Sequence, residues 1–252
     1  MIVPETIRRA AEGHRHPLLF ATIGGAHLCG FPSPDSDWDL RGCHVLPSRE
    51  FLGLRPPRDE TITVTRIEDG VELDLVTHDL RKFLALLARA NGYVLEQVLS
   101  PLVVTSSGEH AELCALARRC VTSNHARHYL GFARSQWQLL ERGTPPRVKP
   151  LLYVYRVLLT GLHLVRTGDL VCDLGTLLLE RRFDDVAALV ECKRAGHEDL
   201  PLANAELARH RQRFDALCAE LLLAREESPL PARHELEPEL DAFLRRVRAA
   251  RG

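Results

Sequence analysis

The hydrophobic period of the chain changes once, near Asp79, and this change limits the folds that the sequence can adopt. Before Asp79, short apolar runs end at Gly, Pro or Asp, a pattern typical of strands and turns. After it, apolar residues recur three and four positions apart, as they do on the buried face of a helix. The sequence therefore predicts an α+β chain, with a small mixed β-sheet core followed by a C-terminal helical bundle.

The segment before the change contains one predicted helix and four predicted strands. The helix covers residues 5–12, and the strands cover 18–23, 38–46, 61–66 and 71–76. The last two strands are joined by Glu68-Asp69-Gly70, a hairpin turn sequence. These elements are expected to form the sheet.

Only helices are predicted after Asp79. The first begins at Leu80, with Asp79 as its N-cap, and Asn91-Gly92 marks its end. The others are expected at 93–99, 111–123, 127–142, 151–167, 174–179, 184–195, 203–226 and 237–250. We therefore divide the chain into an α/β core, residues 1–108, and a helical domain, residues 109–252.

The composition excludes several classes of protein. The 252 residues are 45% apolar, which suffices for one large core or two small ones. Uninterrupted apolar runs long enough for a membrane span are missing, and charge and Pro occupy the place of a signal peptide, so a cytoplasmic protein without a membrane partner is expected. The seven scattered cysteines do not suggest a disulfide framework. The spacing of Cys114, Cys120, His125 and His128 predicts no zinc site.

The near-neutral net charge of −1 conceals an uneven distribution. Residues 32–79 carry eleven Asp or Glu and five Arg, whereas residues 118–166 carry nine Lys or Arg and one Glu. An acidic and a basic segment at one site would suit a metal ion together with a polyphosphate. Part of the basic segment is also expected to bind RNA, and its candidate contacts are Arg127, Arg134, Arg147 and Arg156.

The stretch from residue 23 to 42, IGGAHLCGFPSPDSDWDLRG, carries the strongest indication of function. Gly24 and Gly25 follow a predicted strand and allow a tight turn with close approach of the backbone to a ligand. Asp37 and Asp39 are two positions apart, so on a strand they point to the same face. Two neighbouring carboxylates repel each other, and a hard divalent cation such as Mg²⁺ relieves that repulsion.

A third carboxylate follows on the predicted strand at 71–76. Asp74 lies between two leucines, and Glu72 shares its strand face, so both are candidates, with Asp74 favoured. Three such acids are the arrangement needed for phosphoryl transfer with two metal ions about 3.5–4 Å apart. The simpler alternative is that Asp37 and Asp39 belong to a solvated turn.

These residues resemble the DNA polymerase β-type nucleotidyltransferase superfamily, which has Gly-Gly or Gly-Ser after a strand, then Asp-x-Asp, then a third acid. More closely, GFPSPDSDWDLRG and DLRKFLALLARANGYVLEQVLSP are similar to a bacterial nucleotidyltransferase family, some members of which are associated with RNA repair. The resemblance covers residues 20–101 well. It implies transfer of a nucleoside monophosphate from a nucleoside triphosphate such as ATP to a hydroxyl, with release of pyrophosphate.

The resemblance also implies roles for individual residues. Asp37 and Asp39 would bind two Mg²⁺ ions, for which Mn²⁺ substitutes, and Asp74 would bind the catalytic ion and help to deprotonate the attacking hydroxyl. The nucleotide would be bound by residues on the turn, after it and in the helical half: Gly24, Gly25, Ala26, His27, Ser36, Arg41, Lys149 and Tyr153. Arg41 follows Asp39 by two positions and so faces the same side, where it would either bind phosphate or neutralise the acids. His27 is otherwise an exposed loop residue, and Ser36 a turn residue.

One departure from the family pattern affects the nucleotide site. Where Gly25-Ala26 aligns with Gly-Ser, the serine that would donate a hydrogen bond to the triphosphate is replaced, and backbone N–H groups must bind the phosphates instead. Three hypotheses follow: nucleotidyl transfer to an RNA end, the same chemistry on a small molecule or a protein, and a nucleotide-binding module without turnover. The sequence does not determine the acceptor, the preferred base or the oligomeric state.

Overall fold

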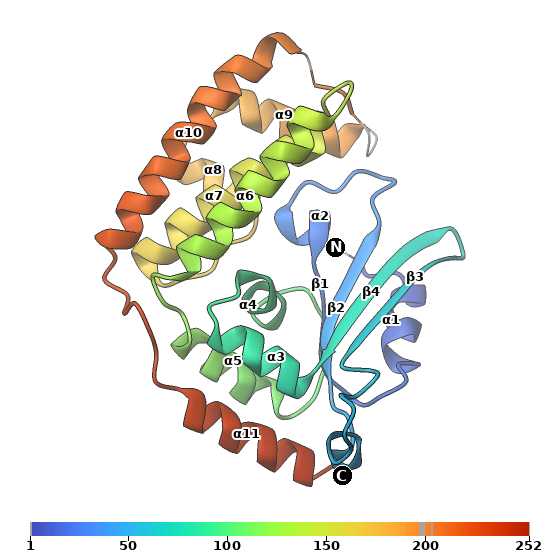
Figure 1. Ribbon diagram of the computed structural model, residues 1–252. Helices are drawn as coiled ribbons and strands as arrows, with labels where there is room; N and C mark the ends of the chain where they lie inside the picture. Colours follow the sequence, from blue (N-terminus) through green and yellow to red (C-terminus); the bar gives the residue numbers. More distant parts are fainter. Residues whose placement is uncertain (1, 197–199, 203, 252) are drawn as a thin grey trace. The chain divides into compact units, whose positions relative to one another are not determined.

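A five-stranded mixed sheet forms the centre of the N-terminal half (Figure 1). Its strands are β1 (Leu18–Ile23), β2 (Trp38–His44), β3 (Thr61–Glu68), β4 (Val71–Asp79) and β5 (Val103–Ser106), in the spatial order β3-β4-β2-β1-β5. Only β2 and β4 pair in parallel, and the other three neighbouring pairs are antiparallel. The predicted α+β fold class is confirmed.

The computed structural model describes residues 2–196, 200–202 and 204–251, without the side chains of 204 and 205. These residues group into two units, which we describe separately. The first contains 2–28, 37–120 and 234–251, and the second contains 29–36 and 121–233. This grouping follows contacts rather than independent folding, so the domain boundary expected after residue 108 stays a prediction.

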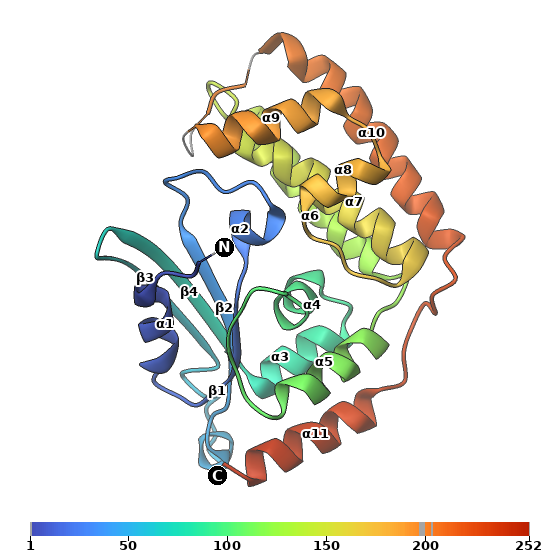
Figure 2. The same cartoon turned by 180° about the vertical axis from the view of Figure 1, so that it is seen from behind.

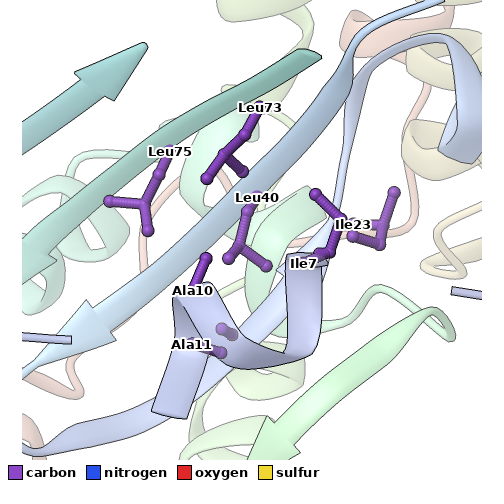
Figure 3. Packing of buried hydrophobic residues seen from close by; sticks show 8 residues of the cluster. Ile7, Ala10, Ala11, Ile23, Leu40, Leu73 and Leu75 are labelled. Atoms are coloured by element: carbon purple, nitrogen blue, oxygen red, sulfur yellow. The ribbon is translucent and has the colours of Figure 1, made fainter. Parts of the chain in front are cut away.

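Helices cover both faces of the sheet in the first unit. Helix α1 (Glu5–Glu12) packs Ile7, Ala10 and Ala11 against apolar residues of β1, β2 and β4 (Figure 3). Helices α3 (Leu80–Ala88), α4 (Gly92–Val98) and α5 (His110–Arg119) lie on the other face. There, Phe20 of β1 contacts the rings of Phe83 and His110. Since side chains alternate along a strand, each strand contributes to both cores.

Helix α11 (Glu237–Ala249) returns to the first unit at the end of the chain. Its Arg248 donates two hydrogen bonds, of 2.7 and 2.9 Å, to the fully buried Asp79 carboxylate. The same carboxylate accepts from the backbone N–H of Arg81 and caps α3. The predicted cap is confirmed, and Asp79 also fixes the C-terminal helix to the sheet.

The structure differs from the sequence predictions most clearly at three places. Strand β5 was not expected, because only helices were predicted after Asp79. Its four residues are too few to show a hydrophobic period, and pairing with β1 keeps them extended. The predicted turn after Gly24 continues as a short helix, α2 (Gly25–Cys29). Strand β2 ends at His44, and the following segment contains a short 3-10 helix, η1 (Ser48–Phe51).

Five helices form the second unit (Figure 2): α6 (His125–Arg142), α7 (Val148–Thr167), α8 (Leu174–Glu180), α9 (Asp184–Ala195) and α10 (Asn204–Glu226). Helix α7 is the central one, and α6, α8, α9 and α10 all contact it. It begins three residues before the predicted start, so Lys149 lies in its first turn.

By length and composition, α7 is apolar enough to cross a membrane. However, 83% of its most apolar stretch is buried inside the fold, as expected for the core helix of a helical bundle.

Candidate active site

The parallel pairing of β2 and β4 places two predicted acids side by side. Asp39 of β2 is in register with Asp74 of β4. Their neighbours Leu40, Leu73 and Leu75 point into the core under α1, so Asp39 and Asp74 project from the opposite face. The two carboxylates therefore meet on one side of the sheet although they are far apart in the sequence.

A guanidinium group lies between the two carboxylates. The Nη2 atom of Arg41 donates to Oδ1 of Asp39 and, at 2.7 Å, to Oδ2 of Asp74. Its Nη1 atom donates to the backbone carbonyl of Asp74 at 2.6 Å and to that of Leu40 at 3.3 Å. The Arg41 side chain is only 10% exposed, and its positive charge offsets the repulsion between the Asp39 and Asp74 carboxylates.

Electrostatic shifts identify a further group at this site. Burial opposes the charge of Arg41, but the Asp39 carboxylate and further contacts outweigh burial and raise the pKa of the guanidinium. The Tyr93 hydroxyl, from the first turn of α4, interacts electrostatically with Arg41. Burial raises the pKa of Tyr93, and the neighbouring acids add to this rise while Arg41 opposes it.

Gly24 and Gly25 allow the backbone after β1 to lie close to Asp39. The Gly24 N–H donates to the Asp39 carbonyl at 2.8 Å, so it contributes to the fold rather than to a ligand. Gly25 has φ +56°, and a Cβ there would come within 1.5 Å of an Asp39 carboxylate oxygen. A larger residue at 25 would displace the Asp39 side chain.

Asp37 is not part of this pair. It precedes the first residue of β2, and the described residues contain no group of three His, Cys, Asp or Glu able to hold a metal ion. Asp39 and Asp74 nevertheless supply hard oxygen donors around a cation, and this donor chemistry fits Mg²⁺. Glu72, the alternative to Asp74, is exposed and in register with Ile67. The roles of all three predicted ligands stay predictions.

The other candidates in the loop after β1 are mostly buried. Ala26 is 1% exposed, and the His27 ring stacks on Trp38 with 4.0 Å between centroids, so His27 is not the exposed loop residue of the simpler interpretation. The Ser36 hydroxyl accepts from the backbone N–H of Ser33 at 2.9 Å. Ser36 thus stabilises the loop in which it lies, and its predicted phosphate contact stays a prediction.

A buried lysine, absent from our sequence predictions, holds this loop within the second unit. The Lys193 ammonium, on α9, donates to the Ser33 hydroxyl at 2.6 Å, and Lys193 is fully buried. The next residue, Arg194, donates to the carbonyl of Gly30 at 2.7 Å. Helix α9 therefore anchors the segment that connects the glycine turn to the Asp-x-Asp strand.

Lys149 and Tyr153 both lie on α7 in the second unit. Tyr153 packs edge-on against Phe31, with 5.2 Å between ring centroids. Arg156 is 2% exposed, and its guanidinium lies 5.8 Å from the centroids of Tyr153 and Phe132. Arg156 is thus a core residue, and its expected contact with RNA stays a prediction. The nucleotide contacts of Lys149 and Tyr153 stay predictions.

Sequence reasoning missed Tyr93 and Lys193 for a common reason. Tyr93 follows Asn91-Gly92, which marked only a helix boundary, and Lys193 lies on a helix without a recognisable motif. Neither residue is near its partners in the sequence. A weak signal was present for Lys193, since it is one of only three lysines among 33 basic residues.

One family model matches nearly the whole chain. The profile described as "RNA repair pathway DNA polymerase beta family" matches residues 2–246. The uncharacterized protein MJ0002 of Methanocaldococcus jannaschii is 30% identical over 69% of this chain and 72% of its own length. The uncharacterized protein YcgL of Bacillus subtilis is 26% identical over 77% and 76%, respectively.

One solved structure is also similar. It is a nucleotidyltransferase-like protein from Exiguobacterium sibiricum, with 15% identity, coverage of 88% of this chain and 73% of that one, and a TM-score of 0.31. At so low a score the likeness carries no argument.

Proposed function

Since the chain belongs to the RNA repair pathway DNA polymerase beta family, we propose that it is a metal-dependent enzyme that transfers a nucleoside monophosphate from a nucleoside triphosphate to a hydroxyl. The family makes it a polymerase β-like nucleotidyltransferase. The metal requirement, the nucleotide and the acceptor are our proposal.

The observation that carries this proposal is the pairing of Asp39 with Asp74 around a cationic group. Asp37, Asp39 and Asp74 would hold Mg²⁺ or Mn²⁺. When bound, the metal supplies charge stabilisation for the attacking and leaving oxygens. Asp74 would accept the proton of the attacking hydroxyl, and Arg41 would bind a triphosphate oxygen.

The remaining proposed nucleotide contacts of the N-terminal half are the turn Gly24–Ala26, His27 and Ser36. On α7, Lys149 and Tyr153 are proposed to contact the nucleotide as well. Because the Gly24 N–H is already bonded, the N–H groups of Gly25 and Ala26 are the proposed backbone donors for phosphate. This replaces the serine that other family members provide.

We propose an RNA end as the acceptor and the cytoplasm as the location. The family description names an RNA repair pathway, and α6 presents exposed arginines. Transfer to a small molecule or a protein side chain is the second candidate, favoured by the acidic −6 balance of residues 32–79, which does not suit nucleic acid.

The decisive experiment is nucleotidyl transfer by the wild type and by the variants Asp37→Asn and Asp39→Asn. Protein is incubated with each α-labelled nucleoside triphosphate, Mg²⁺ or Mn²⁺, and an RNA pool or cell extract. We expect label on an acceptor, and loss of at least about 10³-fold in turnover in each variant, because a metal ligand is removed. Near-normal turnover of both variants would show that the proposed site is wrong.

Circular dichroism and thermal unfolding provide the control for folding. The sequence suggests that Asn relieves repulsion between acids, but Arg41 already bonds Asp39, so Asp39→Asn weakens an ion pair. The Asn carbonyl oxygen still accepts from Arg41, so we expect a folded protein with a small loss of stability.

A further inference from the structure

Arg41 binds the same two carboxylates that the proposed function assigns to a metal ion. Its Nη2 atom bonds one oxygen of Asp39 and one of Asp74, so one guanidinium bridges both strands. The Nη1 bonds to two backbone carbonyls hold the group in this position. Arg41 is thus a resident cation rather than a surface ion pair.

A guanidinium and a divalent cation compete for the same pair of carboxylates. Both are positively charged, and the arginine cannot lose its proton in a protein. Contact between the two cations would bring strong repulsion, because the side chains of Arg41 and Asp39 are 10% and 14% exposed and poorly screened by water. The Arg41 bridge therefore weakens the binding of another cation, and movement of Arg41 away from the carboxylates favours that binding.

A polyphosphate offers Arg41 a new partner. Arginine binds carboxylate and phosphate with the same two-pronged hydrogen-bond geometry, so exchange of one for the other preserves its bonds. A free metal ion brings no anion, and Arg41 would then lose its partners without compensation.

We propose that Arg41 is an exchangeable internal cation which makes metal binding depend on the triphosphate. Without nucleotide, Arg41 closes the Asp39–Asp74 pair and keeps its affinity for free metal ions low. With nucleotide, Arg41 transfers to a phosphate oxygen and the carboxylates become available. Metal and triphosphate therefore bind cooperatively. This inference rests on the proposed function, because it uses the same acids as metal ligands.

The test measures binding of Mn²⁺ alone to the wild type and to Arg41→Gln, by equilibrium dialysis at fixed free Mn²⁺. A neighbouring arginine lowers the affinity of a carboxylate for a proton by about 10- to 10³-fold. Its affinity for another cation should fall in the same direction. We expect Arg41→Gln to bind Mn²⁺ at least about tenfold more tightly than the wild type. A non-hydrolysable triphosphate should then tighten Mn²⁺ binding more in the wild type than in the variant.

Arg9→Gln is the matched control. It removes one positive charge from the same unit, but Arg9 lies on α1, on the other side of the sheet, and pairs with Asp69 at 2.6 Å. Tyr93→Phe keeps the guanidinium and removes a hydroxyl that interacts with it electrostatically, so a smaller tightening is expected. If Arg41→Gln does not fold, this second variant decides.

The outcomes separate this inference from the proposed function. If Arg41→Gln binds Mn²⁺ no more tightly than Arg9→Gln does, and Asp39→Asn abolishes binding, the proposed exchange is wrong. The metal site itself is then supported. With Arg41→Gln unfolded, unchanged Mn²⁺ affinity in Tyr93→Phe overturns it equally. Absence of Mn²⁺ binding from every form, with and without triphosphate, overturns both the exchange and the metal requirement.

Discussion

At the scale of single residues, the site depends on which acid of β4 lies beside Asp39. Side chains two apart share a strand face, so periodicity alone leaves Glu72 and Asp74 as alternatives. The parallel register with β2 puts Asp74 directly opposite Asp39, and Arg41 bonds it there. Substitution of Asp74 and substitution of Glu72 are therefore expected to have different effects.

We expect Asp74→Asn to lower nucleotidyl transfer by about 10³-fold with nucleotide binding largely kept, because a metal ligand and proton acceptor is lost. Glu72→Gln, its matched control on the same strand face, should have a small effect. Turnover and nucleotide affinity measured on both variants check this. The reverse pattern would assign the metal ligand to Glu72.

Substitution of Gly25 is expected to disturb the position of the Asp39 side chain. Gly25→Ala would place a methyl group on the Asp39 carboxylate and force a side chain into a left-handed backbone conformation, at a cost on the order of 1–3 kcal/mol. We expect turnover to fall more than about tenfold as Asp39 moves. Gly53→Ala, where no atom lies near the added methyl group, is the control, and equal effects of the two substitutions would contradict the close approach.

At the scale of elements, a polar cluster joins the start of β1 to the ends of β2 and β4. The His44 Nε2–H donates to the Asp59 carbonyl at 2.8 Å, and its Nδ1 accepts from the Thr77 hydroxyl at 2.9 Å. The Thr77 oxygen also contacts Nε2 of His14 at 3.0 Å. His44 is fully buried, so this arrangement requires the neutral imidazole.

The cluster predicts acid sensitivity. Burial lowers the pKa of His44 to about 4, against about 6.5 in an unfolded chain. Because the unfolded state binds the proton more readily, the contribution of His44 to stability is complete above about pH 6.5 and is lost as pH falls toward 4. The loss is on the order of 2–3 kcal/mol.

Urea unfolding of the wild type and of His44→Gln at several pH values measures this contribution. We expect the stability of the wild type to fall more steeply than that of the variant between pH 6.5 and 4. Parallel curves would mean that His44 does not titrate in this range.

At the scale of the whole molecule, the charge distribution bears on the acceptor. Arg127 and Arg134 are exposed on α6, seven residues apart and so on one helix face. Neither forms an ion pair with any other residue in the described ranges, unlike the exposed arginines of α11. A solvated helix face is the simpler explanation of this pair, and RNA binding is the proposed one.

The two explanations differ in their salt dependence. If α6 contacts single-stranded RNA, log K falls with log salt by about 0.7 per phosphate contact, so Arg127→Gln/Arg134→Gln should reduce the slope by about 1.4. Arg245→Gln/Arg246→Gln on α11 removes the same charge and should leave the slope unchanged. Binding weaker than about 10⁻⁴ M at low salt, or a flat salt dependence, would favour a small molecule or protein acceptor.

The sequence by itself determined the local features of this protein. The change of period near Asp79, the cap at Asp79 and the strand carrying Asp39 depend on neighbours within a few residues, and all three appear in the structure. Family membership follows from motifs of the same short range. The four-residue β5 was missed because its strand geometry comes from pairing with β1 rather than from its own pattern.

Only the tertiary structure decided the composition of the site. The register between β2 and β4 puts Asp74 rather than Glu72 beside Asp39, and the Arg41 bridge depends on the pairing of these two strands. Tyr93 lies on α4, which is distant from β2 in the sequence. Arg156 is buried against the ring of Phe132, which is distant in the sequence, and that of Tyr153, one turn away on α7. Side-chain contacts between distant segments depend on strand register and helix packing, which a one-dimensional pattern does not encode.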